Sequence, residues 1–151
     1  MHANNAIDSL WCFVAEDTAL IRLPDYVGQS EIVDIMSSTF SGNATVQEII
    51  LPKHLRILRE NAFSGCTALR CIWIPKTVRD IPEDVFLHCD ALEAVYYEGS
   101  KQMWEKLPIR RYRDCVSSKG MGAKFTEKRV PLAGNETLFR ATVYFDCIWE
   151  S

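Results

Sequence analysis

A repeat with a period of 23 residues constrains this chain more than any other feature of its sequence. The stretch "NAFSGCTALRCIWIP" at 61–75 aligns with "DVFLHCDALEAVYYE" at 84–98, and the more divergent "STFSGNATV" at 38–46 aligns with both. A chain with such a short fixed period folds as stacked coils, because one coil cannot bury its apolar face alone whereas a stack can. The sequence therefore predicts a solenoid with three coils.

Each copy has the same internal order: an apolar extended segment that ends at Pro, a second short extended segment, and a compact turn. Pro ends the first segment because it lacks a backbone N–H donor. Along "LRCIWIP" the side chains alternate between the two faces, so Cys71 and Trp73 point outward while Ile72 points inward. Stacking places equivalent residues about 4.8 Å apart, which predicts buried rows such as Phe63 over Phe86.

Two of the copies, "IILPKHLRILRENAFSGCTAL" and "IWIPKTVRDIPEDVFLHCDAL", resemble the BspA-like leucine-rich repeats of bacterial proteins. The family pattern is an apolar-x-Ile-Pro strand, then Val-x-x-Ile, then Ala-Phe-x-x-Cys and a closing Leu. The resemblance implies a short, right-handed leucine-rich-repeat solenoid, β-rich within the α/β class, with three coils over about 25–99.

The resemblance extends to the segments that flank the coils. "WCFVAEDTALIRL" is similar to an N-terminal β-hairpin cap, which we expect over about 8–24. "VYYEGSKQMWEKL" resembles the segment after the last coil, which implies a short helix at 100–107, and "GNETLFRATVYFD" implies a C-terminal strand over 134–148. We therefore expect one complete domain over 1–151 with a helix-plus-strand cap, although the same pattern fits a fragment of a longer array.

Three departures from the family pattern stand out. Asn43 replaces the Cys of the first copy, and the stretch from Pro24 to Pro52 is five residues longer than its successor, which predicts a bulge around "DYVGQSE". An insert at 108–133 stands where the family has a short loop.

The outward face of the strands is the first candidate for function. The 23-residue register aligns Ile50, Trp73 and Tyr96 in one row, which we expect Arg22 to begin from the hairpin, with Glu48, Cys71 and Ala94 in a second row and Gln47, Arg70 and Glu93 in a third. Exposed Trp, Tyr and Arg side chains are typical of binding hot spots. The predicted partner-binding residues are Arg22, Glu48, Ile50, Arg70, Trp73 and Tyr96. The alternative, which stays open here, is that the C-terminal segment covers this row and makes Trp73 and Tyr96 part of the core.

The insert at 108–133 is the second candidate. It carries seven Lys or Arg and two acidic residues, whereas the rest of the chain has a net charge of −8. Tyr112 and Phe125 lie among these basic residues, a pattern that suits RNA or an acidic protein surface. A solvated loop explains the same residues, and it is favoured because nucleic-acid binders usually carry a basic domain as well. The candidate contacts are Arg110, Arg111, Arg113, Lys124, Lys128 and Arg129.

Nothing in the sequence has the pattern of an active site. Cys66 and Cys89 occupy the repeat position where the family has a buried Cys, and buried thiols are inert. Cys115 lies beside Arg111 and Arg113, so a thiol enzyme remains the weakest of the alternatives. No CxxC pair and no phosphate-binding glycine loop occurs, so we predict no enzyme activity, no metal and no cofactor.

The remaining expectations concern compartment and partner. No apolar run approaches the ~20 residues of a membrane span, and no basic residue precedes the short apolar stretch "LWCFVA", so neither membrane insertion nor export is expected. The location expected from the sequence is the cytoplasm, while the resemblance implies surface-exposed or secreted relatives. We predict a non-enzymatic interaction module that binds a protein through its strand face, with a glycan as another option and nucleic acid, bound at 110–129, as the competing hypothesis.

Overall fold

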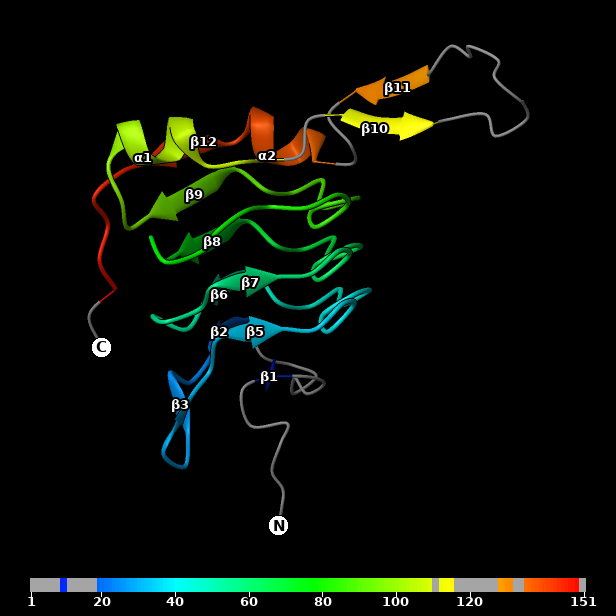
Figure 1. Cartoon of the computed structure of the whole chain (residues 1–151). Helices are drawn as coiled ribbons and strands as arrows, with labels where there is room; N and C mark the ends of the chain where they lie inside the picture. The colour runs from blue at the N-terminus through cyan, green and yellow to red at the C-terminus, as the bar shows by residue number, and fades with distance from the viewer. Residues whose placement is uncertain (1–8, 11–18, 110–111, 116–127, 132–134, 150–151) are drawn as a thin grey trace, which may run out of the picture.

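The protein is a stack of coils, seen from the side in Figure 1. The structure, a computed structural model, describes residues 9–10, 19–109, 112–115, 128–131 and 135–149. Within these residues each coil contributes one strand to a main sheet, and several coils add a short strand to a second sheet. This arrangement agrees with the solenoid predicted from the 23-residue period.

The main sheet has five parallel strands in the order β12-β9-β8-β6-β2. Residues 23 apart in the sequence pair directly, as Glu48 does with Cys71 and Cys71 with Ala94. The predicted register of the coils is therefore correct, and one further strand pairs at each end of the sheet. The strands are β2 (Leu20–Arg22), β6 (Glu48–Ile50), β8 (Cys71–Ile74), β9 (Ala94–Tyr97) and β12 (Thr142–Tyr144).

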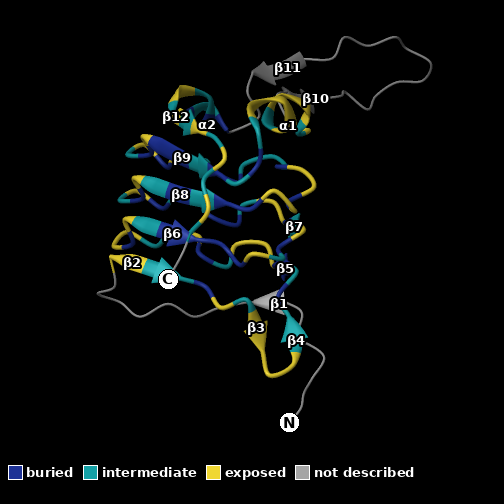
Figure 2. Ribbon diagram, turned by 90° about the vertical axis from the view of Figure 1, so that its left-hand side faces the viewer, coloured by how far each residue is buried: buried dark blue, intermediate teal, exposed yellow. Residues whose placement is uncertain are grey.

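A second parallel sheet of three short strands has the order β1-β5-β7. Its strands are β1 (Ser9–Leu10), β5 (Asp34–Ile35) and β7 (Ile57–Leu58), and a bridge between Ile81 and Ile109 repeats this pairing farther along the stack. The core lies between the two sheets, where Figure 2 shows buried residues on the inner side of every coil.

The core contains a ladder of phenylalanines, as the repeat predicts. Phe40, Phe63 and Phe86 are buried, and the ring centroids of successive residues are 5.5 and 5.8 Å apart in stacked geometry. We call these three residues the phenylalanine ladder. The thiols of Cys66 and Cys89 each donate a hydrogen bond of 3.1 Å to the Phe carbonyl of the preceding coil. The repeated Cys thus ties one coil to the next.

The compact turns have the same backbone in every coil. Gly42, Gly65 and His88 occupy equivalent positions, with φ of 80°, 80° and 63° respectively. This left-handed conformation favours glycine, and a Cβ added at Gly65 would lie 3.3 Å from the backbone nitrogen of Gly42. His88 adopts a conformation that the two earlier turns satisfy with glycine.

The predicted N-terminal hairpin at 8–24 lies largely outside the described residues. The described strands of this region, β1 and β2, each pair in parallel with a repeat strand, so they extend the two sheets of the stack. Residues 11–18, which would supply the other arm of the hairpin, lie outside the described residues. The apolar end of the first coil favours this arrangement, because parallel pairing covers its strand edges.

A hairpin does occur at the bulge predicted around "DYVGQSE". The strands β3 (Tyr26–Val27) and β4 (Ser30–Glu31) pair antiparallel. Gly28 is the first of the two loop residues and has φ of 64°, a conformation that a type II′ turn requires at this position. The five extra residues of the first coil form this projection, which lies beside the N-terminal end of the stack (Figure 1).

The helix α1 (Lys101–Lys106) lies within the predicted range 100–107. Its N-cap residue is Ser100, whose hydroxyl accepts a hydrogen bond of 3.1 Å from the Met103 backbone. Trp104 packs edge-on against Tyr97, with ring centroids 5.0 Å apart. The helix thereby packs beside β9, the strand that contains Tyr97.

The predicted strand over 134–148 is wrong in its first half. This region contains α2 (Glu136–Arg140) before the short strand β12. In the coils, the backbone N–H groups of Phe40 and Phe63 donate to carbonyls of the next coil, whereas that of Phe86 donates to the side-chain oxygen of Asn135 at 3.2 Å. The Asn135 amide also donates to the Pro82 carbonyl at 2.9 Å. Asn135 therefore supplies the Phe86 N–H with an acceptor where Phe40 and Phe63 use a carbonyl of the next coil.

The insert at 108–133 also differs from the predicted loop. It contains an antiparallel ribbon of β10 (Tyr112–Cys115) and β11 (Lys128–Pro131), with Asp114 opposite Arg129. Figure 1 shows this ribbon beside the end of the stack that carries α2.

Candidate partner-binding face

A row of side chains crosses the outward face of the main sheet. Direct pairing places Arg22 beside Ile50, Ile50 beside Trp73, Trp73 beside Tyr96, and Tyr96 beside Tyr144. The rings of Trp73 and Tyr96 are stacked with centroids 4.5 Å apart, and those of Tyr96 and Tyr144 with centroids 5.3 Å apart. We call Trp73, Tyr96 and Tyr144 the aromatic row. Its spacing follows from the spacing of adjacent strands.

The aromatic row is open to solvent at one end and partly covered at the other. Tyr144 is 48% exposed, while Trp73 and Tyr96 are half-buried. Ile50, which we predicted as a partner contact, is buried with 2% exposure, and Ala94 in the neighbouring row is buried as well. The prediction of an exposed Ile50 is therefore wrong, because other side chains cover this position.

The C-terminal segment, residues 145–149, lies against part of the aromatic row. After β12 it runs past the ends of the main-sheet strands toward β2 (Figures 1 and 2). The backbone N–H groups of Asp146 and Cys147 each donate a hydrogen bond of 2.9 Å to the carbonyls of Gly99 and Tyr97. Trp149 then contacts Trp73 edge-on, with ring centroids 5.2 Å apart. The C-terminal segment therefore contacts Trp73, and neither Trp73 nor Tyr96 is fully buried.

A pocket of about 60 Å³ lies between the strand face and the C-terminal segment. Ile50, Trp73 and Tyr96 form one wall, and Cys147 and Trp149 form the other. The charged residues around the pocket are Arg22, Lys53 and Glu98.

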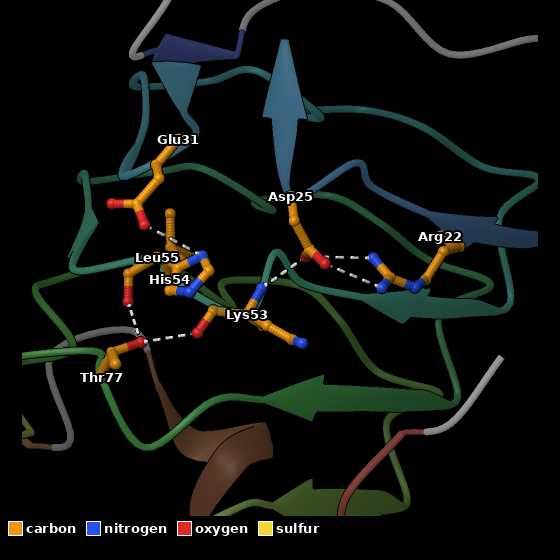
Figure 3. A network of polar contacts seen from close by, with 7 residues as sticks. All are labelled: Arg22, Asp25, Glu31, Lys53, His54, Leu55 and Thr77. Atoms are coloured by element: carbon orange, nitrogen blue, oxygen red, sulfur yellow. Dashed lines mark hydrogen bonds and ion pairs between the residues drawn. The ribbon is translucent and has the colours of Figure 1, made fainter. Parts of the chain in front are cut away.

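Arg22 is held in place by the carboxylate of Asp25 (Figure 3). Its guanidinium donates hydrogen bonds of 3.3 and 3.2 Å to Asp25, which also accepts one of 2.8 Å from the Lys53 backbone. Burial alone would raise the pKa of Asp25, but the hydrogen bonds from Arg22 and Lys53 outweigh it, so the pKa of this carboxyl is lowered. Asp25 therefore stays ionised and fixes the start of the row.

A family model described as "BspA type Leucine rich repeat region (6 copies)" matches residues 20–107, from the start of β2 to the end of α1. The chain belongs to this family. Comparison with curated proteins and with solved structures gave no match. In this BspA-type repeat protein, the matched residues contain the coils, whereas α2, β12 and the C-terminal segment lie beyond them.

The other two predicted contacts on the strand face of this BspA-type protein, Glu48 and Arg70, each have a partner on the same face. Glu48 accepts a hydrogen bond of 2.6 Å from the indole nitrogen of Trp73, and Arg70 forms an exposed ion pair of 3.0 Å with Glu93. Between them, burial raises the pKa of the Cys71 thiol, and the charges of Glu48 and Glu93 raise it further. Cys71 therefore lacks the thiolate character that a nucleophile needs.

Of the two repeat cysteines, Cys89 lacks thiolate character as well. Contact with the Cys66 thiol and burial together raise the pKa of the Cys89 thiol, which therefore stays protonated at neutral pH. Among the described residues, no group of three or more His, Cys, Asp or Glu side chains lies close enough to hold a metal ion. No helix in the described part of the chain is long and apolar enough to cross a membrane.

The structure places the basic candidates of the insert only in part. Arg113 lies on β10, and Lys128 and Arg129 lie on β11, with Cys115 paired to Lys128 in the ladder. Arg110, Arg111 and Lys124 lie outside the described residues.

The sequence reasoning missed two residues of the face, Tyr144 and Trp149. A signal for Tyr144 was present, because "TVYF" at 142–145 repeats "AVYY" at 94–97 and so continues the row. Trp149 has no equivalent in the repeat, and its position depends on the path of the C-terminal segment.

Proposed function

We propose that this BspA-type repeat protein is a non-enzymatic interaction module that binds a protein partner through the aromatic row. The stacked, partly exposed rings of Trp73, Tyr96 and Tyr144 are the observation that carries the proposal. Trp and Tyr dominate the binding energy of protein interfaces, because each combines a large apolar area with a polar group. Membership of a leucine-rich-repeat family supports the same function class.

The row is also rigid before a partner arrives. Each ring projects from a strand that is hydrogen-bonded in register to its neighbours, and each stacks on the next ring. A preorganised aromatic surface loses little conformational entropy on binding, so more of its contact energy remains as affinity. Ile148, which is 65% exposed, adds an apolar side chain from the adjacent C-terminal segment.

The test compares two tyrosines of nearly equal exposure on different parts of the molecule. Tyr144 in the row is 48% exposed, and Tyr26 on the β3–β4 hairpin is 49% exposed. Wild type, Tyr144→Ala and Tyr26→Ala are immobilised and used to capture proteins from a lysate of the native organism. A captured protein is then produced in pure form and its affinity for all three chains is measured by calorimetry.

We expect Tyr144→Ala to weaken binding at least tenfold, as interface hot spots do, and Tyr26→Ala to bind like wild type. Equal affinities for the three chains would refute the aromatic row as the binding site. Retention of a glycan in place of a protein would contradict the protein-partner proposal but keep the site.

Nucleic-acid association through the insert is the competing hypothesis. Titration of the protein with a single-stranded RNA at low salt tests it, because phosphate contacts are strongest there. Binding that weakens steeply with salt and is unaffected by Tyr144→Ala would favour the insert over the aromatic row.

A further inference from the structure

We infer that the open edge of β12 accepts an extended segment of the partner, which adds to the main sheet as a further parallel strand. This inference rests on the proposed function and specifies how the partner reaches the aromatic row. β12 is the last strand of the main sheet in the part of the chain that the structure describes, and it pairs there with β9 alone. Figures 1 and 2 show it at the end of the stack.

The backbone of β12 presents hydrogen-bonding groups at this edge. Residues with outward side chains donate their N–H groups to the preceding strand, as Ala94 does to the Arg70 carbonyl at 3.1 Å. Thr142 donates to the Glu93 carbonyl in the same way, at 3.0 Å. Successive peptide groups of a strand point to opposite edges, so the N–H and C=O groups of Val143 point away from β9 and have no hydrogen-bond partner among the described residues. Such an edge is a template for another strand.

The last ring of the aromatic row is open toward the same edge. Tyr96 stacks between Trp73 and Tyr144, whereas Tyr144 has a single ring neighbour within the described residues, which agrees with its exposure of 48%. Adjacent strands lie about 4.8 Å apart, so an aromatic residue of an added strand, level with Tyr144, would stack on the free face of its ring. The added strand would extend the aromatic row by one ring.

The inward side of β12 specifies the residues on either side of that ring. Val143 and Phe145 are partly buried and pack against the core. Because side chains alternate along a strand, the two neighbours of the partner's aromatic residue would lie beside Val143 and Phe145, where apolar groups are favoured. The partner segment should therefore have the pattern apolar–aromatic–apolar. β9 has this pattern already, with Val95 and Tyr97 buried on the two sides of Tyr96.

A second copy of this chain is a less suitable occupant. It would have to offer β2, the strand at the other edge of the main sheet. The β3–β4 hairpin projects past β2 at that end of the stack (Figures 1 and 2). In a head-to-tail pair this hairpin would meet the neighbouring molecule before β2 could pair with β12. The geometry therefore favours a separate, extended segment.

The short length of β12 limits what the backbone can contribute. The strand has three residues, and Asp146 beyond it has φ of 58°, which is outside the extended range. When a partner adds a strand to a sheet, main-chain hydrogen bonds supply affinity and alternate side chains supply specificity. Over so few residues the affinity should depend on the stacked ring as well as on the backbone.

The test uses a peptide copied from the chain itself. N-acetyl-Glu-Ala-Val-Tyr-Tyr-Glu-amide has the sequence of residues 93–98, which contain β9. The intact, isotope-labelled protein is titrated with this peptide, and its backbone amide signals are followed in proton–nitrogen NMR spectra. We expect the Val143 amide signal to shift saturably, with a dissociation constant on the order of 1 mM. The amide signal of Ile49, a buried residue of β6, serves as the reference and should not shift.

Two N-methylated peptides test the main-chain pairing on the unchanged protein. In the parallel register of the coils, the N–H of the first tyrosine faces β12, as that of Thr142 faces β9, and the N–H of the preceding valine faces away. N-methylation of this tyrosine should weaken binding about tenfold or more, whereas N-methylation of the valine should leave the affinity within about twofold. Equal effects of the two methyl groups, or a stronger effect at the valine, would overturn the parallel addition.

A peptide with alanine in place of the first tyrosine tests the stacked ring. Wild type should bind it about tenfold more weakly than the parent peptide. The Tyr144→Ala variant should bind the two peptides with equal affinity, because the ring on which the tyrosine stacks is absent. A preference for the parent peptide that persists in Tyr144→Ala would contradict the inference.

Two variants at one position separate the backbone of the edge from its side chain. Val143→Pro removes the N–H at the open edge without removing a donor to β9, and proline is tolerated on edge strands for this reason. Val143→Ala shortens the side chain and keeps the N–H. Val143→Pro should abolish binding of the parent peptide, whereas Val143→Ala should keep its affinity within about threefold. Equal affinities of the two variants would overturn the inference, and the N-methylated peptides test the same edge if Val143→Pro does not fold.

Sedimentation of the free protein tests the second copy as the occupant. If wild type self-associates at the concentration of the titration and Val143→Pro does not, the edge receives another copy of the chain and the inference is wrong. A wild type that stays monomeric under these conditions supports a separate partner segment.

These outcomes separate the inference from the proposed function. If the peptide fails to bind while Tyr144→Ala still abolishes binding of a captured protein, the aromatic row remains the binding site and the strand addition is wrong. If the peptide binds as expected while Tyr144→Ala has no effect on that protein, β12 accepts a strand and the aromatic row is not the partner surface.

Discussion

The phenylalanine ladder and the aromatic row are two stacks of rings built by the same coils. Both have centroid spacings between 4.5 and 5.8 Å, because both repeat with the stacking of the coils. The ladder consists of one residue type and is almost fully buried, whereas the row changes from Trp to Tyr and reaches 48% exposure at Tyr144. The same geometry thus supplies cohesion on one side of the coil and a surface for recognition on the other.

The largest expected effect comes from breaking the ladder. Phe63 contacts a stacked ring on each side, so Phe63→Ala should leave a cavity and destabilise the protein by about 3–5 kcal/mol. Tyr144→Ala, which truncates the exposed end of the row, should cost about 1 kcal/mol or less. Urea unfolding of both variants measures the difference. A similar loss of stability in the two variants would mean that the aromatic row is part of the core, as the phenylalanine ladder is.

The second effect concerns how the ladder ends. The Asn135 side chain is fully buried and supplies Phe86 with the acceptor that a further coil would provide. Asn135→Ala leaves the Phe86 N–H and the Pro82 carbonyl without partners and should cost about 2–3 kcal/mol in urea unfolding.

Asn135→Asp keeps an acceptor for Phe86 and serves as the matched variant, although it buries a charge. If Asn135→Ala left the free energy of unfolding unchanged, the segment with α2 would not stabilise the end of the stack.

The repeat predicts the ladder and most of the row because both depend on local alternation and a constant period. It predicts that Trp73 lies beside Tyr96, and this is confirmed. It does not predict the burial of Ile50, and it does not predict the contact of Trp149 with Trp73, which has no counterpart in the coils. The repeat also does not predict α2. The segment that contains α2 is positioned by Asn135, whose side chain bonds to Phe86 where a repeat coil would use a backbone carbonyl.

The third prediction concerns the turns that align the ladder. His88 has φ of 63° where the two preceding coils have glycine. His88→Gly should remove the strain of the left-handed conformation, although glycine loses more backbone entropy on folding. The net result should be a stabilisation of the protein by about 0.5–1 kcal/mol. Gly65→Ala, at the same repeat position, should destabilise it, because the new Cβ lies 3.3 Å from the Gly42 backbone. Thermal unfolding measures the opposite effects expected for the two variants. If His88→Gly were less stable than wild type, the His88 side chain would make a stabilising contact that outweighs the backbone strain.

The smallest effect lies at the beginning of the outward face, where Asp25 holds Arg22. The pKa of Asp25 is lowered in the folded protein, so the unfolded chain takes up its proton first as the pH falls. The stabilisation by this carboxylate is therefore complete above the unfolded value of 3.8 and is lost as the pH falls through the folded value.

Asp25→Asn should cost about 1 kcal/mol or less at pH 7, and its difference from wild type should shrink below about pH 4. Asp80→Asn, at an exposed carboxylate on another coil, controls for the change in net charge. A constant difference between Asp25→Asn and wild type from pH 7 to pH 3 would mean that the ion pair with Arg22 contributes nothing.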